Sequence, residues 1–299
     1  MPGQLSIENP GPDSLRIVLA GRWLLTEGTP SDADVAITVL DEYQGRGVGR
    51  IMIETLALIA RHRDVRWLHF DVLAENTALA VIIPTLNEGH HVDALLDDLQ
   101  ALRTGGHEII LVDGGSRDDT VERARTRVDQ LTVTAHGRAH QMNAGAKLAS
   151  HAMLWFLHAD SRVPEGAPQE ILANASETTW GRFDIQLSGR DWRLRIIERL
   201  MNWRSCLSGI ATGDQGIFVT RALFEAIGCF PDQPLMEDIA LCTRLRRQVR
   251  PYCIHAPRLQ TSSRRWETQG ILRTILLMWG LRLAYALGAP PERLARHYR

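Results

Sequence analysis

The chain has 299 residues, enough for one large domain or two modest ones with a sizeable core. Apolar residues make up 44% of it, which predicts a globular protein and excludes a disordered one. The 34 Lys and Arg residues nearly balance the 35 Asp and Glu residues, so we expect no nucleic-acid partner.

The first 77 residues are expected to form short strands around a glycine-rich turn. We predict strands at residues 15–20, 22–25, 35–40 and 67–72. The turn Gln44-Gly45-Arg46-Gly47-Val48-Gly49 precedes a helix whose first N–H groups favour a phosphate. It resembles the acyl-CoA pyrophosphate loop of the GNAT N-acetyltransferases, and the resemblance covers residues 15–77. Because the elements that complete the CoA cleft in that family do not follow, we interpret residues 1–77 as a truncated GNAT acetyltransferase-like segment that does not bind acetyl-CoA.

Three short apolar runs follow, at residues 80–83, 109–112 and 153–157. They are rich in Val, Ile and Leu and too short for helices, so we predict buried parallel strands. Helical segments are expected at residues 88–103, 118–129 and 139–150. Strands and helices that alternate at this spacing predict an α/β fold with a covered, mostly parallel sheet.

Polar and acidic residues come directly after each of these predicted strands. They are Pro84, Thr85, Asn87, Glu88, Asp113, Gly114, Ser116, His158 and Asp160. Ligands bind such sheets at the carboxyl ends of the strands, where these residues are expected to meet. A polar, acidic rim on a hydrophobic sheet indicates a site for a nucleotide and a divalent cation.

Six motifs follow one another in this part of the chain. They are PTLNE, VDGGSRDDT, GRAHQMNAGA, FLHADS, GDQGIF and MEDIAL. Their order resembles that of the family 2 glycosyltransferases of the GT-A fold, and most of all the small soluble subfamily linked to arsenosugar biosynthesis and radical-SAM selenodomain genes. The resemblance implies a GT-A domain over residues 78–299, with a Rossmann-like, mostly parallel sheet flanked by helices.

The resemblance also implies nucleotide contacts at the strand ends. Residues from Pro84 to Glu88 would lie along the nucleoside. Asp113, followed by Gly114 and Ser116, would accept a hydrogen bond from the base, which is uracil in most relatives.

Local structure offers a second explanation for two of these residues. Asn87 also suits the N-cap of the helix expected from Glu88. Asp113 also suits a turn before Gly114 and Gly115. A turn explains one Asp but not the recurrence of carboxylates at successive strand ends, so both explanations stay open.

Basic and amide side chains are implied at the diphosphate. Arg138, Gln141 and Asn143 lie near the start of the helix expected from residue 139, whose N–H groups would face a phosphate; plain helix initiation is the alternative. Arg264 and Arg265 belong to the sequence SSRRW, which resembles the Arg-Trp motif that closes over the pyrophosphate in relatives. Arginine suits that role because its guanidinium bridges two phosphate oxygens.

The tripeptide His158-Ala159-Asp160 occupies the position of the D-x-D metal motif. By resemblance Asp160 binds a Mg²⁺ or Mn²⁺ ion, which stabilises a departing nucleoside diphosphate. His158 replaces the first Asp of the motif. It is either a second metal ligand or a buried structural histidine.

The pair Glu237-Asp238 opens a helix expected to reach residue 248. By resemblance Asp238 is the general base that removes the proton of the acceptor hydroxyl, and Glu237 lies beside it in the catalytic site. Stabilisation of the helix N-terminus by negative charge is the alternative. The motif GDQGIF, residues 213–218, is expected to form a strand and the floor beside this pair.

The segment at residues 190–209 is expected to be an amphipathic, arginine-rich helix. Its apolar positions at helical spacing are Trp192, Ile196, Leu200, Trp203 and Leu207. We predict that this stripe packs into the core. The alternative is a basic face for an anionic lipid or a phosphate-bearing acceptor.

Neither the cysteine spacing nor any apolar segment indicates a secreted or membrane-spanning chain. The four cysteines include no C-x-x-C pair, so we expect reduced thiols and a cytoplasmic protein. The N-terminal residues lack the basic-then-apolar pattern of a signal peptide. Arg273 and Arg282 interrupt residues 271–288, which therefore lack the ~20 uncharged residues that a membrane span requires. We predict a core helix there, with peripheral membrane contact as the alternative.

The sequence thus predicts a metal-dependent, inverting glycosyltransferase. It would move a sugar from a nucleotide-sugar donor, expected to be a UDP-sugar, to the hydroxyl of a small-molecule or lipid-linked acceptor. One alternative is a bifunctional or acetyl-CoA-dependent N-acetyltransferase that uses residues 44–49. The other is a non-catalytic nucleotide-sugar-binding protein.

Overall fold

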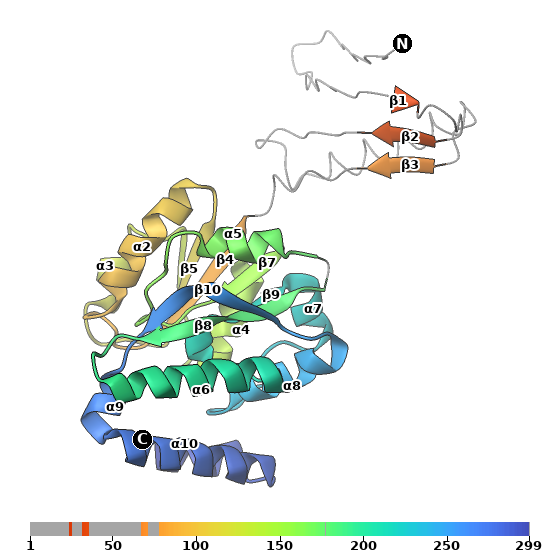
Figure 1. Ribbon diagram of the computed structural model, residues 1–299. Helices are drawn as coiled ribbons and strands as arrows, with labels where there is room; N and C mark the ends of the chain where they lie inside the picture. Colours follow the sequence, from red (N-terminus) through yellow and green to blue (C-terminus); the bar gives the residue numbers. More distant parts are fainter. Residues whose placement is uncertain (1–23, 26–31, 36–66, 71–77, 177, 299) are drawn as a thin grey trace. The chain divides into compact units, whose positions relative to one another are not determined.

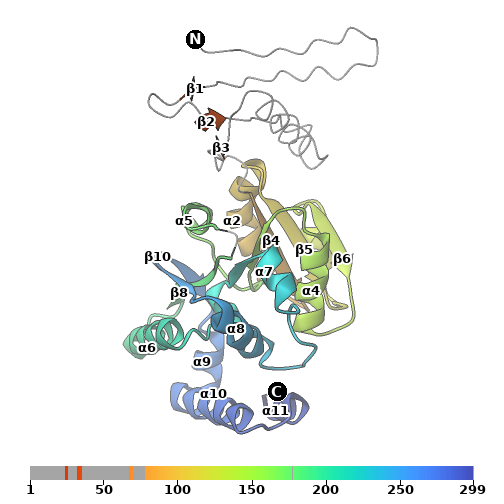
Figure 2. The same cartoon turned by 90° about the vertical axis from the view of Figure 1, so that its right-hand side faces the viewer.

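The computed structural model describes residues 24–25, 32–35, 67–70, 78–176 and 178–298. The chain divides into two units, Met1–Asn76 and Thr77–Arg299. Figure 1 and Figure 2 label most of the elements of both units.

Three short strands are described in the first unit. They are β1 (Leu24–Leu25), β2 (Asp32–Val35) and β3 (Trp67–Phe70). β2 pairs antiparallel with β1 and parallel with β3. The strand predicted at 67–72 is therefore present over its first four residues. The glycine-rich turn at 44–49 and the helix expected after it lie outside the described residues.

The second unit begins with alternating strands and helices. The first elements are β4 (Leu79–Thr85), α2 (Val92–Thr104), β5 (Glu108–Asp113), α3 (Thr120–Ala124), β6 (Gln130–Val133), α4 (Arg138–Leu148), β7 (Met153–Phe156) and α5 (Ala167–Ala173). The remaining elements are β8 (Trp180–Leu187), α6 (Trp192–Ser208), the 3-10 helix η2 (Gly213–Gln215), β9 (Phe218–Thr220), α7 (Arg221–Ala226), α8 (Glu237–Gln248), β10 (Tyr252–Thr261), α9 (Arg264–Gln269), α10 (Ile271–Ala286) and α11 (Pro291–Tyr298).

The described strands of this unit form one seven-stranded sheet in the order β10-β8-β9-β7-β4-β5-β6. β4 pairs parallel with both β5 and β7, so the three strands predicted from their apolar runs are confirmed as parallel neighbours. β9 is antiparallel to its neighbours β7 and β8, which makes the sheet mixed. The carboxyl ends of β4, β5 and β7 therefore meet at one edge, which we call the strand-end edge.

Helices cover both faces of this sheet, as Figure 2 shows. Successive residues of a strand point to opposite faces. In β4, Val81 and Ile83 belong to the core shared with α2, α3, α5 and α6. Ala80 and Ile82 belong to the core shared with α4, α7 and α8. Because all seven residues of β4 are buried, the strand-end edge is the part of β4 from which polar side chains can reach a ligand.

The apolar stripe of α6 does not pack into the core, so that prediction is wrong. Trp192, Trp203 and Leu207 are 66–73% exposed. The buried face of the helix instead carries Leu194, Ile197, Glu198, Asn202 and Ser205. α6 is therefore apolar toward solvent and partly polar toward the sheet.

The prediction of four reduced thiols is also wrong. Cys206 of α6 and Cys253 of β10 form a disulfide with a Cα–Cα distance of 6.0 Å. Cys229 and Cys242 are free. No helix among the described residues is both long and apolar enough to cross a bilayer.

Candidate active site

The turns that end β4 and β5 are tied together by hydrogen bonds. Oδ1 of Asp113 accepts the N–H groups of Gly115 at 2.8 Å and Ser116 at 2.7 Å. Oδ2 of Asp113 accepts the hydroxyl of Thr85 at 3.2 Å and the hydroxyl of Ser116. The Gly114 N–H donates to the Thr85 carbonyl at 2.9 Å. With Asp113 only 1% exposed, its carboxylate satisfies the donors of its own turn.

The loop after β4 is joined to the second turn by Asn87. This residue has a left-handed backbone, with φ of 55°. Its N–H donates to Ser116 Oγ at 2.8 Å, and its Oδ1 accepts the Arg117 N–H at 2.9 Å. α2 begins only at Val92, with His91 as its N-cap, so the interpretation of Asn87 as a helix cap is wrong.

Gln141 holds the ends of β4 and β5 together from α4. It is 3% exposed, and its Nε2 donates to the carbonyls of Thr85 at 2.7 Å and Val112 at 2.8 Å. Pro84 pairs with Val112 in the same register. A Cβ added at Gly114 would lie 3.2 Å from the Gln141 amide, so the glycine allows this close approach. The amide nitrogen of Gln141 is thus fully used by the backbone.

Asn143 is likewise engaged with the backbone. Its Nδ2 donates to the carbonyl of Phe230 at 2.9 Å, and its Oδ1 accepts the N–H of Phe230 at 3.0 Å. Phe230 lines a crevice that also contains Asp238. Asn143 therefore positions one wall of that crevice.

A second group of polar side chains lies between the end of β7 and the start of α8. It consists of Asp160, Asp214 in η2, Glu237 and Asp238, and we call these four with Glu88 the acidic cluster. Burial is the largest cause of the raised pKa values of Glu88, Asp214 and Glu237. Asp160 raises the pKa of Glu88 and of Asp214 further. Asp238 does the same for Asp214 and Glu237, so the five carboxyl groups share one region of negative charge.

Asp238 is held by the backbone on both carboxylate oxygens. Oδ2 accepts the Gly213 N–H at 3.0 Å, and Oδ1 accepts the Ile239 N–H at 2.7 Å. The preceding Met236 has a left-handed backbone with φ of 66°, which turns the chain into α8. Asp238 is half-buried in the crevice and retains free lone pairs on both oxygens.

Glu237 lies deeper than its neighbour and is 5% exposed. Burial and the adjacent Asp238 raise the pKa of Glu237 to about 7, although Arg138 opposes the change. Glu237 therefore holds a proton for a large part of the time near neutral pH, and it can donate a hydrogen bond that an ionised carboxylate cannot.

Arg138, at the start of α4, is one of the basic residues that face the acidic cluster. Desolvation lowers the pKa of Arg138, but Glu237, Tyr298, Asp238 and Asp160 together raise it above its usual range. Its side chain is nevertheless exposed to solvent. It is therefore both surrounded by acidic groups and open to a ligand.

The two arginines of α9 have different surroundings. Arg264 Nη1 lies 2.7 Å from Nε2 of His91, and Arg264 also lies close enough to Glu88 to lower its pKa. The Arg265 guanidinium lies 3.8 Å from the centre of the Tyr298 ring and donates to the Tyr298 carbonyl at 2.9 Å. Arg264 thus reaches the strand-end edge, whereas Arg265 fastens α9 to the end of α11.

His158 packs directly against η2. A Cβ added at Gly213 would lie 2.4 Å from His158 Nε2. Burial, and to a lesser extent Arg138, lowers the pKa of His158 to about 3, so the ring is neutral at physiological pH. A neutral ring suits both a metal ligand and a packed structural histidine.

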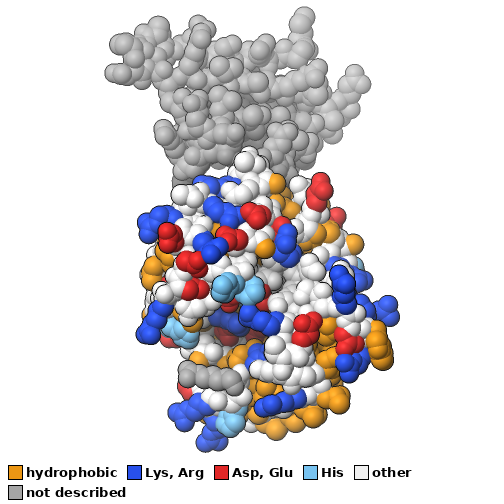
Figure 3. Space-filling model, turned by 90° about the vertical axis from the view of Figure 1, so that its left-hand side faces the viewer, with side chains coloured by type: hydrophobic (Ala, Val, Ile, Leu, Met, Phe, Trp, Pro, Cys, Tyr) orange, Lys and Arg blue, Asp and Glu red, His pale blue; other side chains and the backbone are white. Residues whose placement is uncertain are grey.

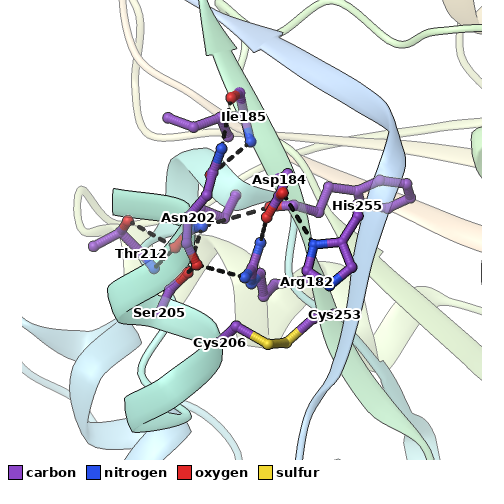
Figure 4. A network of polar contacts seen from close by, with 11 residues as sticks. Arg182, Asp184, Ile185, Asn202, Ser205, Cys206, Thr212, Cys253 and His255 are labelled. Atoms are coloured by element: carbon purple, nitrogen blue, oxygen red, sulfur yellow. Dashed lines mark hydrogen bonds and ion pairs between the residues drawn. A yellow bond between two sulfur atoms is a disulfide. The ribbon is translucent and has the colours of Figure 1, made fainter. Parts of the chain in front are cut away.

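A buried polar network joins β8 to α6 (Figure 4). Arg182, which is 0% exposed, forms an ion pair with Asp184 and donates to the Asn202 carbonyl at 2.7 Å. The Asn202 side chain pairs with the N–H and the carbonyl of Ile185 at 2.9 and 3.0 Å. These contacts explain why the inward face of α6 is polar.

The same network continues to η2. Ser205 of α6 accepts a hydrogen bond from Gln215 Nε2 at 2.9 Å. Oε1 of Gln215 accepts the N–H of Thr212 at 3.2 Å, completing a capping box around η2. Since the Gly213 N–H holds Asp238, the network fixes the backbone that orients this carboxylate.

Figure 3 shows the face that lies on the left in Figure 1. Acidic, basic and histidine side chains meet near the middle of the described surface. Such a mixture suits a ligand that carries phosphate and binds a cation.

The acidic cluster fits a divalent cation that is shared with a ligand. Among the described residues, no group of three His, Cys, Asp or Glu side chains could enclose a metal alone. Mg²⁺ usually takes one or two carboxylates and completes its shell with substrate phosphates and water. Oδ1 of Asp214 is buried and has no hydrogen-bond partner in the described part of the chain. A carboxylate oxygen in that state is one that a nearby cation would stabilise.

Comparison with known proteins identifies the domain that carries this site. Residues 80–221 match the family described as Glycosyl transferase family 2. This stretch, just under half of the chain, is similar to the family 2 glycosyltransferases. A PGL/p-HBAD biosynthesis glycosyltransferase of Mycobacterium bovis is 30% identical to the chain over 163 residues, which cover 50% of the chain and 61% of that relative. The match thus spans about three-fifths of the length of that relative.

Solved structures share the fold of this domain. The mannosyltransferase PcManGT of Pyrobaculum calidifontis, in complex with GDP-Man and Mn²⁺, matches with a TM-score of 0.53 and 20% identity over 86% of this chain and 79% of its own. Glucosyl-3-phosphoglycerate synthase of Mycobacterium tuberculosis, in complex with Mn²⁺, UDP and phosphoglyceric acid, matches with a TM-score of 0.50 and 16% identity over 73% and 81%. Together with the mixed seven-stranded sheet, these likenesses confirm the predicted GT-A fold.

The sequence alone did not single out Asp214. The motif GDQGIF was expected to form a strand and a floor, but its first three residues form η2 and only its last residue, Phe218, begins β9. The signal was an acidic residue next to Gly213 in a motif that precedes the predicted base. Its meaning depends on the distance to Asp160 and Asp238, which the sequence does not contain.

Proposed function

We propose that this protein is an inverting, metal-dependent glycosyltransferase that transfers a sugar from a nucleotide-sugar to an acceptor hydroxyl. The observation that carries the proposal is the placement of Asp238. Its carboxylate is oriented by the Gly213 N–H at 3.0 Å and lies among carboxyl groups at the strand-end edge of a family 2 domain. A UDP-sugar is the proposed donor.

In the proposed reaction Asp238 is the general base. A lone pair of its carboxylate takes the proton of the acceptor hydroxyl while the acceptor oxygen bonds to the anomeric carbon. The bond from that carbon to the diphosphate oxygen breaks at the same time, and the electron pair leaves with the nucleoside diphosphate. Attack opposite the leaving group inverts the anomeric centre.

Glu237 has a different proposed role because its pKa is raised by burial and by Asp238. The protonated fraction can donate a hydrogen bond to the sugar or the acceptor. We propose that Glu237 orients the acceptor, while the less buried Asp238 accepts the proton.

The strand-end edge is the proposed nucleoside site. Pro84, Thr85, Asn87, Glu88, Asp113, Gly114 and Ser116 line this edge. Since Asp113, Gln141 and Asn143 are occupied with backbone groups, we propose that they shape the site and that Arg138 and Arg264 contact the diphosphate directly. We propose that Arg265 positions α9, and with it Arg264, through its contact with Tyr298.

Asp160 is the proposed protein ligand of the divalent cation, with Asp214 as an additional candidate from its unpartnered Oδ1. The cation, when bound, would stabilise the charge of the departing diphosphate. His158 keeps two proposed roles, as a metal ligand or as the residue that packs against Gly213.

Release of nucleoside diphosphate by the purified full chain tests this proposal. The chain is incubated with UDP-sugars and GDP-sugars, with Mn²⁺ or with a chelator. The proposal predicts metal-dependent release that rises when the correct acceptor is added. Binding of a nucleotide-sugar without release or transfer under any condition would favour the non-catalytic alternative.

The proposed function includes neither acetyl transfer nor a cellular location. The acetyltransferase alternative depends on residues 44–49, which lie outside the described residues, so we do not propose that activity. A cytoplasmic location stays a prediction, and the Cys206–Cys253 disulfide does not fit the reduced thiols expected there.

A further inference from the structure

Two helices at one end of the second unit present apolar stripes to solvent. On α6 the exposed side chains are Trp192, Ile196, Leu200, Trp203 and Leu207. On α10 and its C-cap they are Leu272, Leu276, Trp279, Leu283 and Leu287. The exposed fractions of these ten large apolar side chains run from 47% to 79%, and such a concentration on two helices indicates an interaction surface.

This apolar surface is local rather than a general property of the protein. Among the described residues, the other exposed large hydrophobic side chains are Val133, Leu148 and Tyr252, each on a different element. α6 and α10 run alongside one another in Figure 1, and apolar side chains gather along the lower part of Figure 3. We call the two stripes together the apolar face.

The helices around the apolar face carry a strong positive charge. Residues 192–208 and 264–298 contain ten Arg and three Glu, a formal charge of +7, in a chain whose formal net charge is −1. Arg199 and Arg273 are exposed, and neither makes a side-chain hydrogen bond or ion pair with another described residue. Long arginine side chains can lie along apolar surface while their charged ends reach anionic groups.

We propose that the apolar face docks on the surface of an anionic lipid bilayer. Leu and Ile side chains would enter the boundary between headgroups and acyl chains, and the arginines would contact lipid phosphates. Trp192, Trp203 and Trp279 fit this depth because an indole has an apolar body and a polar N–H. Peripheral docking also suits α10, since a helix of 16 residues is ~24 Å long, shorter than the ~30 Å hydrocarbon core.

A second copy of the chain is a poorer occupant. A two-fold interface brings the same patch of each subunit together. It would therefore place the arginines of one copy against those of the other, and like charges across an interface are unfavourable. An anionic bilayer complements both the apolar and the basic character of these helices.

Co-sedimentation of the full chain with vesicles tests the proposal without any catalytic readout. The vesicles are phosphatidylcholine alone, or phosphatidylcholine and phosphatidylglycerol at about 7:3. We expect binding to the mixed vesicles that weakens with added salt, and little binding to the neutral ones. The triple variant Leu200→Ser, Trp203→Ser and Trp279→Ser should bind the mixed vesicles at least ~10-fold more weakly.

A matched control separates docking from a general loss of apolar surface. The variant Val133→Ser, Leu148→Ser and Tyr252→Ser also removes three exposed apolar groups and should bind within about twofold of the wild type. Both variants should keep the wild-type far-UV circular dichroism. Failure of the wild type to bind mixed vesicles, or equal binding by the two variants, would overturn the proposal. So would a wild-type dimer that the first variant converts to monomer without any vesicle binding.

Discussion

Asp113, at the end of β5, and Asp238, at the start of α8, are carboxylates of the same domain with different surroundings. Asp113 is 1% exposed and accepts hydrogen bonds from two N–H groups and two hydroxyls. Asp238 is half-buried, accepts two N–H groups and lies beside Glu237 and near Asp214. The Asp113 carboxylate is thus satisfied by donors of its own turn and of β4, whereas Asp238 belongs to a cluster with excess negative charge.

The difference shows how a polar residue at a sheet edge can serve either the fold or the chemistry. Three of the four donors to Asp113 belong to Gly115 and Ser116 of its own turn, and the fourth is the Thr85 hydroxyl of the neighbouring strand, so the folded chain satisfies the carboxylate without a ligand. The acidic cluster combines residues from separate parts of the chain and leaves Asp214 Oδ1 without a partner. A cation and a diphosphate would balance the charge of the acidic cluster, whereas Asp113 needs no ligand for that purpose.

The largest stability effect is expected at Asp113. The Asp113→Ala variant removes a buried acceptor of four hydrogen bonds and should lower the free energy of unfolding by about 3–5 kcal/mol. Urea unfolding measures this loss. The control is Asp119→Ala, which removes an exposed partner of Arg123 and should cost under about 1 kcal/mol. Similar small losses of unfolding free energy in both variants would show that the hydrogen bonds to Asp113 do not stabilise the fold as we expect.

A pH-dependent effect is expected at Glu237. Its pKa is raised in the folded state, so the folded protein binds more protons than the unfolded chain between about pH 4.5 and pH 7. Wild-type stability should therefore fall as the pH rises through that window, relative to the non-ionising Glu237→Gln variant. We compare the free energy of unfolding of the Glu237→Gln variant with that of the wild type. The advantage of the variant at pH 8 should exceed its advantage at pH 4 by at most about 3 kcal/mol. A difference that does not change with pH would contradict the burial of an ionisable Glu237.

Much of this domain follows from its sequence because short-range patterns determine it. The apolar runs at 80–83, 109–112 and 153–157 became β4, β5 and β7, and each predicted helix between them is present, although α3 is reduced to Thr120–Ala124. The alternation of strand and helix was enough to place the polar residues after these strands at one edge.

The contacts of each polar residue could not be predicted from the sequence, because they join residues that are distant in sequence. Gln141 reaches Thr85, 56 positions away, and Asn143 reaches Phe230, 87 positions away. Periodicity predicted an amphipathic α6 but not the polar network of Asn202 that turns its apolar stripe outward. The Cys206–Cys253 pairing likewise requires the packing of α6 near β10.

The smallest stability effect is expected at Asp160. Its half-buried side chain makes no hydrogen bond with another described residue, so Asp160→Ala should change the unfolding free energy by under about 0.5 kcal/mol. The same variant should lose the Mn²⁺-dependent part of UDP binding. Calorimetric titration of UDP with and without Mn²⁺ measures this. The control is Arg199→Gln, which changes an exposed α6 side chain that is not part of the acidic cluster. Equal UDP affinity with and without Mn²⁺ in the wild type would remove the metal assignment.

The most direct test compares turnover and donor affinity in the Asp238→Asn variant. A carboxamide keeps the shape of the side chain but does not take up the hydroxyl proton. We expect near-normal donor affinity and melting temperature, with acceptor-dependent sugar transfer reduced about 10²- to 10⁴-fold. The Glu237→Gln variant, measured alongside, should lose less of this sugar-transfer activity. Near-normal transfer by Asp238→Asn would contradict the role of Asp238 as the base and the division between the two kinds of carboxylate.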